Sequence, residues 1–272
     1  MNCFILSDNR PPLHIKEDTS HVCCTEHGLC IYLETARHKL LLDTGASDLF
    51  LKNAERLGVD LSKVDYVFIS HGHRDHLGGL EFFLKVNKTA KVIMSPAILG
   101  SRYYSERNSL HSITCDSSFD SFLGRFVLIE GNRVVDSDLH IITQFVHPYP
   151  MPKANELLKV KRNEADDLCP DDFGHEMALY IDGLLYLGCA HNGLLNIMDA
   201  SPFPLNCVLG GFHLLDGFET PQELAAIADV LKTNYPSCKF ITGHCTGSEA
   251  FRLLKQTRCD MMSFHSMQYI HL

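Results

Sequence analysis

The sequence has no run of apolar residues near the length of about 18 that a membrane-spanning helix needs. Residues 1–8 are apolar only briefly and have no basic flank, so we expect no secretory signal peptide. The 11 cysteines are scattered, odd in number and never spaced as Cys-x-x-Cys, which argues against a disulfide framework. These absences predict a cytoplasmic protein with reduced thiols.

Basic residues are also scarce. Lys and Arg number 24 against 33 Asp and Glu, and the formal net charge is -9. Proteins that bind nucleic acid carry basic patches, so this balance argues against such a partner. A bound metal would offset part of the negative charge locally, and an anionic substrate stays compatible with the composition. The 272 residues, 45% of them hydrophobic, suffice for one α/β domain with a substantial core.

One stretch concentrates the residues that can carry chemistry. Residues 67–69, Val-Phe-Ile, form a short apolar run that predicts a buried strand. Four polar residues follow closely: His71, His73, Asp75 and His76. His71 and His73 are two apart, so on an extended segment they point the same way. Asp75 and His76 follow where a helix should begin, and they should face the same cavity from another direction.

These residue types indicate a metal site. Neutral imidazole and carboxylate are good ligands for zinc, iron or manganese. The alternative is a polar loop with solvated histidines, and with 16 histidines in the chain an isolated pair would mean little. Four ligand-type residues directly after a buried strand are much harder to obtain by chance. The pattern therefore favours two adjacent metal ions.

The spacing His71-x-His73-x-Asp75-His76 resembles the signature of the metallo-β-lactamase superfamily. Further segments resemble its dihydropteroate-synthase-like or ribofuranosylaminobenzene-phosphate-synthase-like branch. The resemblance implies an α/β fold, a four-layer αββα sandwich with mixed sheets. It implies a single domain over residues 1–272, with a lid or insertion around residues 147–175. The further matching segments are residues 26–29, 42–45, 188–191, 210–214 and 243–247.

The same resemblance implies two divalent metal ions as cofactors. Zinc is the first expectation, with iron and manganese as alternatives. The ligands would come from the first stretch and from two later strand ends: His71, His73 and His191 for one ion, and Asp75, His76 and His244 for the other.

At one strand end the sequence departs from the family pattern. The family usually has a Gly-Asp pair there, whose carboxylate bridges the metals, whereas this chain has Gly188-Cys189 with His191 two residues on. Either Cys189 is a thiolate ligand, or Cys189 is a bystander and His191 takes the metal. We favour His191, and both alternatives stay open at this point.

Other residues have expected roles around the metals. Asp75 is the expected catalytic residue, which would orient the nucleophile and accept its proton. The resemblance implies that Asp43 orients a metal-bound histidine, with a helix cap as the alternative. His213, like Cys189, is a candidate ligand or a support for one. Glu26 and His27 are candidates for contact with the substrate.

Local patterns predict several elements. A helix is expected over residues 47–57 with Ser47 as its N-cap, and another over residues 77–86. Asp182-Gly183 between two apolar runs is typical of a tight hairpin turn.

Three stretches are less regular. Residues 97–123 show no clear element, and residues 125–146 carry short strands that should begin the second half of the sandwich. Residues 147–174 are charged, poor in apolar residues and interrupted by prolines. They would form either a lid over the substrate or a disordered surface insertion.

These expectations predict a metal-dependent hydrolase for a small-molecule ester, amide or phosphoester. Metals lower the pKa of bound water toward ~7, so hydroxide is available at neutral pH. One alternative is a mononuclear iron oxidoreductase similar to persulfide dioxygenases. A flavodiiron protein fits less well, because it would have Glu in place of His73 and an extra flavin domain. A pterin-pathway enzyme, which the branch name implies, and a non-catalytic metal-binding module are further alternatives.

Overall fold

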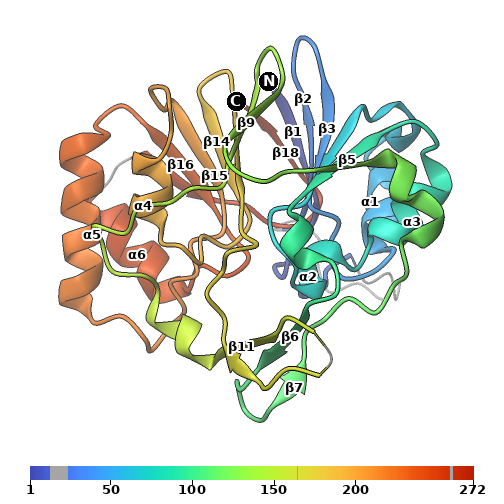
Figure 1. Ribbon diagram of the computed structural model, residues 1–272. Coiled ribbons are helices and arrows are strands. Elements are labelled where there is room, and N and C mark those ends of the chain that lie inside the picture. Colours follow the sequence, from blue (N-terminus) through green and yellow to red (C-terminus); the bar gives the residue numbers. More distant parts are fainter. Residues whose placement is uncertain (13–23, 164, 258–259) are drawn as a thin grey trace, which may run out of the picture.

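Two large β-sheets face each other, and helices cover the outer face of each sheet (Figure 1). The structure is a computed structural model that describes residues 1–12, 24–163, 165–257 and 260–272. The α/β class and the mixed sheets that the sequence predicts are confirmed. Within the described ranges, no helix has the length and apolar character needed to cross a membrane.

The first sheet joins the two ends of the chain. Its edge strand β18 (Gln268–His271) pairs antiparallel with β1 (Asn2–Ser7), so the termini lie together (Figure 1). After these two strands the spatial order is β2 (Cys30–Glu34), β3 (Lys39–Leu42), β4 (Tyr66–Phe68), β5 (Lys91–Met94) and β8 (Phe126–Leu128). Neighbouring strands from β3 to β8 are parallel.

The second sheet contains the predicted hairpin. Asp182 and Gly183 adopt φ values of 48° and 84°, as a tight two-residue turn requires, and they connect two antiparallel strands. The spatial order of the sheet is β17 (Met261–Ser263), β16 (Lys239–Thr242), β15 (Cys207–Gly210), β14 (Leu184–Leu187), β13 (Ala178–Ile181), β10 (Leu139–Ile142) and β9 (Arg133–Asp136). Neighbouring strands from β14 to β17 are parallel.

Helices pack on the outer side of each sheet. On the first sheet these are α1 (Leu49–Arg56) and α3 (Leu80–Val86), and on the second they are α4 (Leu194–Asp199), α5 (Pro221–Asn234) and α6 (Ser248–Thr257). The one-turn helix α2 (Arg74–Leu77) lies between the sheets at one end (Figure 1). Short 3₁₀ helices are η1 (Leu61–Lys63), η2 (Pro96–Ile98), η3 (Asp120–Arg125) and η4 (Lys153–Leu157).

The strands are apolar on both faces because each sheet is covered on both sides. In β3, Leu40 and Leu42 point into the core between the two sheets, whereas Leu41 points toward α1 and α3. In β14, Tyr186 points into the same central core, and its neighbours Leu185 and Leu187 point toward the outer helices. This alternation accounts for the continuous apolar runs in the sequence.

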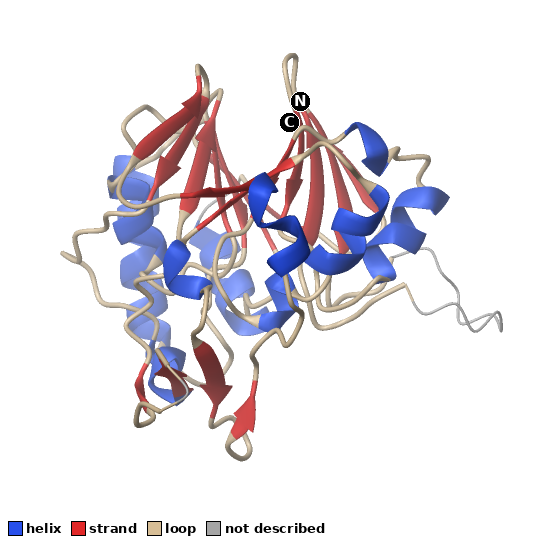
Figure 2. Cartoon of the chain, turned by 45° about the vertical axis from the view of Figure 1, so that its right-hand side comes forward, coloured by secondary structure: helices blue, strands red, loops and turns tan. Residues whose placement is uncertain are grey.

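A third, small sheet lies beyond one end of the large ones, and Figure 2 shows its short strands apart from them. Strand β6 pairs antiparallel with β11, which brings together segments more than 50 residues apart. The order of the sheet is β12 (Cys169–Pro170), β11 (Leu158–Lys161), β6 (Arg102–Ser105) and β7 (His111–Ser112). Residues 97–123 therefore contain strands that the sequence did not predict.

Two further local predictions need correction. The helix predicted over residues 77–86 is broken, because Gly78 and Gly79 lie against backbone oxygens of the 44–47 loop and separate α2 from α3. The strand predicted over residues 126–129 is β8, which belongs to the first sheet and not to the second. In both cases a contact with a distant part of the chain decides the outcome.

The predicted helix over residues 47–57 is present as α1, but it begins two residues later. Its N-cap residue is Asp48, not Ser47. The Ser47 hydroxyl instead donates to Glu26 at 2.6 Å and accepts the Leu49 N–H at 3.2 Å.

Replacing Gly79 with alanine should destabilise the fold. The new Cβ would lie 2.1 Å from the Thr44 carbonyl oxygen, a backbone atom that cannot move aside alone. We expect the free energy of unfolding, measured by urea denaturation, to fall by about 2–3 kcal/mol. Gly124→Ala is the matched control, since its Cβ would meet nothing within 4 Å and its cost should be below about 0.5 kcal/mol. Equal losses in the two variants would contradict this explanation.

Candidate metal centre

The loop after β4 places the first four predicted residues in the orientation that the sequence suggests. His73 has extended backbone, with φ -73° and ψ 143°, and it precedes α2. His71 and His73 therefore lie on an extended segment, and Asp75 and His76 lie on the first turn of the helix. Gly72 permits this path, because a Cβ there would lie 2.5 Å from the ring of Tyr103.

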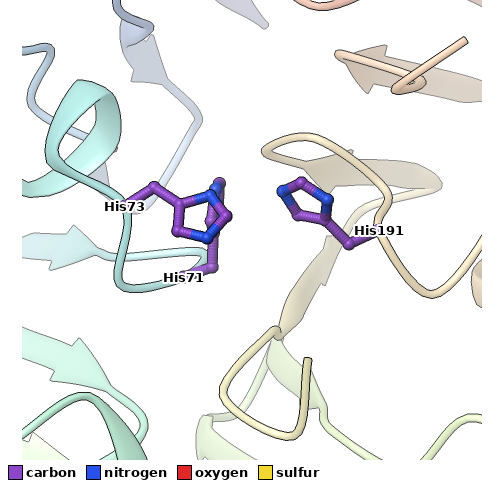
Figure 3. Close-up of side chains that lie close together, drawn as sticks. All are labelled: His71, His73 and His191. Carbon is purple, nitrogen blue, oxygen red and sulfur yellow. The ribbon is translucent and has the colours of Figure 1, made fainter. Parts of the chain in front are cut away.

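A first ligand group consists of three buried histidines from two distant loops. His71 and His73 face His191, which follows β14 in the second sheet (Figure 3). Their ligand atoms lie within 4.8 Å of one another. The Nε2 atom of each ring is buried and has no hydrogen-bond partner in the described chain. Three buried, unpartnered nitrogens that converge on one point fit a metal ion, which neutral imidazole binds well.

In His71 and His191, a hydrogen bond from Nδ1 places the ring proton on that nitrogen. The lone pair of Nε2 therefore stays free for a metal ion. The Ser70 hydroxyl donates to Asp43 at 2.7 Å, so it accepts the Nδ1–H of His71 at 2.8 Å. The Asn155 side-chain oxygen accepts the Nδ1–H of His191 at 3.1 Å. Burial and neighbouring imidazoles hold the pKa of His71 and of His191 well below the usual range. Both rings are therefore neutral at pH 7, the form that binds a metal.

A second group lies beside the first. The Nε2 atoms of His76 and His244 are 3.0 Å apart, and the Asp75 Oδ2 atom is 3.8 Å from the first and 3.3 Å from the second. A tetrahedral zinc ion with bonds of about 2.0–2.3 Å separates its ligand atoms by about 3.3–3.8 Å. Burial disfavours charge on His244, but the hydrogen bond with Asp75 outweighs it and raises the pKa to about 9. The donor set fits a metal ion, and the two separations that involve Asp75 match the expected range, whereas the two imidazole nitrogens lie slightly closer together.

The structure gives Cys189 and His191 separate places. His191 joins His71 and His73, whereas the Cys189 sulfur lies 3.2 Å from His76 Nε2 in the second group. The two residues are therefore not competitors for one position. The loop after β14 therefore supplies His191 to the first ligand group and Cys189 to the second.

Asp43 connects the two ligand groups through hydrogen bonds. Its carboxylate accepts hydrogen bonds of 2.7 Å from the Ser70 N–H, the Ser70 hydroxyl, His76 Nδ1 and the Tyr186 hydroxyl. The bond to His76 turns that ring's Nε2 toward the second group. Asp43 does not cap α1, whose N-cap is Asp48. The geometry thus matches the orienting role and not the capping alternative.

His213 and the two candidates for substrate contact differ in their surroundings. His213 is buried, its ring lies 4.2 Å from that of His191, and neither ring nitrogen has a partner in the described chain. His27 is largely exposed, and its Nε2 lies 3.3 Å from Asp75 Oδ2. The Glu26 carboxylate is occupied by the Ser7 and Ser47 hydroxyls and the Ala46 N–H, so it braces the loop around Gly45.

Several residues of the site lie outside the sequence-based prediction. Asp171 is buried, with its carboxylate 3.1 Å from His175 Nε2 and 3.7 Å from His73 Nε2. Burial opposes its ionisation, but the hydrogen bond with His175 and the nearby His73 imidazole outweigh that effect and lower the pKa. Asn155 and Cys245 are the other two. Of these three residues, only Cys245 lies in a segment that the sequence analysis used, residues 243–247. That segment indicated His244 as a ligand and assigned no role to Cys245.

His73 and His191 of the first group and Asp75 and His244 of the second line a cavity of about 940 Å³. Its walls include residues of the small sheet and of η4, so the 147–175 insertion and the 102–112 hairpin both border the site. Asn155 in η4 also accepts from the His191 ring and donates to the His191 carbonyl at 2.7 Å. The insertion therefore touches the candidate metal centre directly.

Comparison with known proteins agrees with this architecture. The family model of the metallo-beta-lactamase superfamily matches residues 25–103. A solved metal-dependent hydrolase of the beta-lactamase superfamily aligns over 100% of this chain and 99% of its own, with a TM-score of 0.78 and 24% identity. A solved diphosphatase from the PhnP family aligns over 100% and 97%, with a TM-score of 0.53 and 14% identity. The chain therefore has the metallo-β-lactamase fold.

Two curated relatives come from Methanocaldococcus jannaschii. An uncharacterized protein is 27% identical over 85% of this chain and 88% of its own. A 7,8-dihydropterin-6-methyl-4-(beta-D-ribofuranosyl)-aminobenzene-5'-phosphate synthase is 23% identical over 90% of each.

Removing the Tyr186 hydroxyl should weaken the network around Asp43. Tyr186→Phe keeps the ring in the central core but deletes a 2.7 Å hydrogen bond to a buried carboxylate. We expect the free energy of unfolding to fall by about 1.5–3 kcal/mol, the usual contribution of a hydrogen bond to a charged group. Tyr32→Phe is the control, because the hydroxyl of that buried tyrosine has no hydrogen bond to another described residue. If Tyr186→Phe is as stable as Tyr32→Phe, the bond does not support the site.

Proposed function

We propose that the protein is a metal-dependent hydrolase of a small-molecule ester, amide or phosphoester. One observation carries the proposal: three buried histidine nitrogens without partners converge beside a second group of carboxylate and imidazole donors, and members of both groups line a cavity. The fold adds support, since metal-dependent hydrolysis is common in the superfamily. Two divalent ions would be bound, and the nitrogen-rich donor set favours zinc.

Each ligand group would hold one ion. His71, His73 and His191 would bind the first, and Asp75, His76 and His244 the second, with the Cys189 sulfur beside them. Bound ions lower the pKa of water toward about 7 and polarise the bond to be cleaved.

Asp75 is the residue placed to handle the proton of the attacking water. Its carboxylate is partly exposed to the cavity, at 19% of the side chain, whereas the neighbouring ligands are fully buried. Burial opposes its ionisation, but His76, His244 and His27 outweigh burial and hold the pKa of Asp75 well below its usual range. A carboxylate that is ionised at neutral pH can orient water and take up its proton.

Loss of a first-group histidine should remove both metal and turnover. We expect His71→Ala and His191→Ala to bind about one metal ion fewer per chain and to lose at least about 100-fold in kcat/KM, because the electrophilic centre is lost. Metal content by elemental analysis and a screen of ester, amide and phosphoester substrates would measure both. His140→Ala is the control, since His140 packs on Tyr180 and Phe203 away from the cavity. Full activity of the chelator-treated wild type would refute the proposal.

Among the three substrate classes, the charges at the cavity favour a phosphoester. Arg74 and Arg107 line it, and neither guanidinium has an ion pair or side-chain hydrogen bond to another described residue. The acids Glu26 and Asp216 also line it, but their carboxylates are occupied by hydrogen bonds within the chain. Two guanidinium groups without an ion pair to a described residue are therefore available at the cavity wall, which suits an anionic group on the substrate.

Arg107→Ala should raise the KM for a phosphoester by about tenfold, which corresponds to roughly 1.4 kcal/mol of lost ground-state binding. The kcat should change little, because Arg107 lies at the cavity wall and not among the metal-ligand candidates. A neutral ester of similar size should keep its KM. The control Arg133→Ala removes an exposed charge on β9, away from the cavity. An equal effect on charged and neutral substrates would exclude a phosphate-specific role.

Two other functions have some support. The relative named as a synthase forms, by its name, a pterin-linked phosphate, and a cavity of about 940 Å³ has the size of a small-molecule site. Saturable quenching of pterin fluorescence by the protein would favour that class of substrate. A mononuclear iron oxidoreductase would leave the second group unfilled, so one iron and no second ion per chain in the purified protein would favour it over the hydrolase.

A further inference from the structure

Three strand ends of the second sheet bring a separate donor cluster to the cavity wall. Cys189 follows β14, His213 follows β15 and Cys245 follows β16. Their ligand atoms lie within 4.8 Å of one another, and all three residues are buried and line the cavity. Two of them, His213 and Cys245, have no part in the six-residue ligand set described above.

His213 is the least satisfied side chain of this cluster. It is 8% exposed, yet neither Nδ1 nor Nε2 has a hydrogen-bond partner in the described chain. An imidazole normally keeps at least one of its nitrogens bonded when it is buried. His213 also has φ 49°, a left-handed conformation that is uncommon for a residue other than glycine. A strained, buried and unpartnered imidazole next to two thiols indicates a missing ligand.

The neighbouring backbone at His213 and Gly211 fixes the position of the Cys245 side chain. Its sulfur accepts the backbone N–H of His213 at 3.3 Å. A Cβ on Gly211 would lie 2.4 Å from this sulfur, so the space for the thiol exists only because residue 211 is glycine. Together with its contact to the Cys189 carbonyl at 3.7 Å, the bond from the His213 N–H fixes the sulfur beside Cys189 and His213.

We infer that Cys189, His213 and Cys245 form a third metal site, which takes a thiophilic divalent ion such as Zn²⁺. Two thiolates and one imidazole are an established zinc donor set, and softer donors select against magnesium and calcium. Cys189 is shared, because its sulfur also lies 3.2 Å from His76 Nε2 in the second group. The site goes beyond the two ions of the proposed hydrolase, and it does not depend on which reaction the protein catalyses.

The competing explanation is a redox pair. Cys189 and Cys245 are both free thiols in the structure, and an oxidant such as peroxide would be needed to join them. A disulfide would leave His213 as unpartnered as before, whereas a metal ion would satisfy all three side chains. The unpartnered imidazole therefore favours the metal site.

The test is a metal titration of the full chain, kept reduced with a phosphine throughout. Zn²⁺ should saturate at three ions per chain in the wild type and at two in Cys245→Ser and in His213→Ala. In a Co²⁺ titration the thiolate-to-metal absorption should fall by about half in Cys245→Ser. Cys169→Ser removes an exposed thiol outside the cluster and should behave as wild type. Saturation at two ions in the wild type, or unchanged stoichiometry and absorption in both variants, would overturn the inference.

A second measurement on the wild type guards against variants that do not fold. The metal-free protein is loaded with two or three equivalents of Zn²⁺ and treated with iodoacetamide, and each cysteine is quantified by mass spectrometry. Cys245 should become protected with the third equivalent. The site would be excluded if the labelling of Cys245 does not change when the third equivalent of Zn²⁺ is added. A Cys189–Cys245 disulfide in the reduced protein would also exclude it. These readouts need no turnover, so an inactive hydrolase would leave the test intact.

Discussion

The Asp43 carboxylate is the contact on which the rest of the site depends. It is fully buried, and four hydrogen bonds of 2.7 Å compensate for its loss of water. Those bonds reach the ends of β3 and β4, the helix α2 and, through Tyr186, the opposite sheet. One charge therefore holds the two halves of the sandwich in register at the edge where the ligands gather. Without it, Ser70 and His76 would lose the partners that fix their orientation.

The surrounding loops converge because of their backbone conformations. Asp43, Ala190, His213 and His244 all have positive φ, between 49° and 59°, and each lies just after a strand. Parallel strands carry their following loops to one edge of a sheet, and two such edges face each other here. The left-handed residues turn each loop inward over that edge. Strain of this kind persists only where tight packing or a ligand supports it, which fits a binding site.

Local rules explain what could be predicted from the sequence. The spacing of His71, His73, Asp75 and His76 follows from the strand and helix periods, and the turn at Asp182-Gly183 follows from the φ values that those residues tolerate. Long-range contacts explain what could not. The break at Gly78-Gly79 depends on the loop at residues 44–47, and the place of β8 depends on pairing with β5.

The same distinction applies to the site. Cys189 and His191 looked like alternatives because they are two residues apart, and only the turn at Ala190 sends them to different groups. Asn155 and Asp171 could not be placed from the sequence, since pairing between β6 and β11 decides where their segments lie. Cys245 was visible in the sequence beside His244, but its role depends on the space that Gly211 leaves.

Buried donor atoms gather at this edge of the sheets, and we propose that they are metal ligands. Anomalous diffraction from crystals of the full chain grown with Zn²⁺, recorded on both sides of the zinc absorption edge, tests this proposal most directly. We expect one peak among His71, His73 and His191 and a second among Asp75, His76 and His244, beside the third-site peak at Cys189, His213 and Cys245. Crystals with full Zn²⁺ exposure and no anomalous peak at either of the first two positions would contradict the proposal.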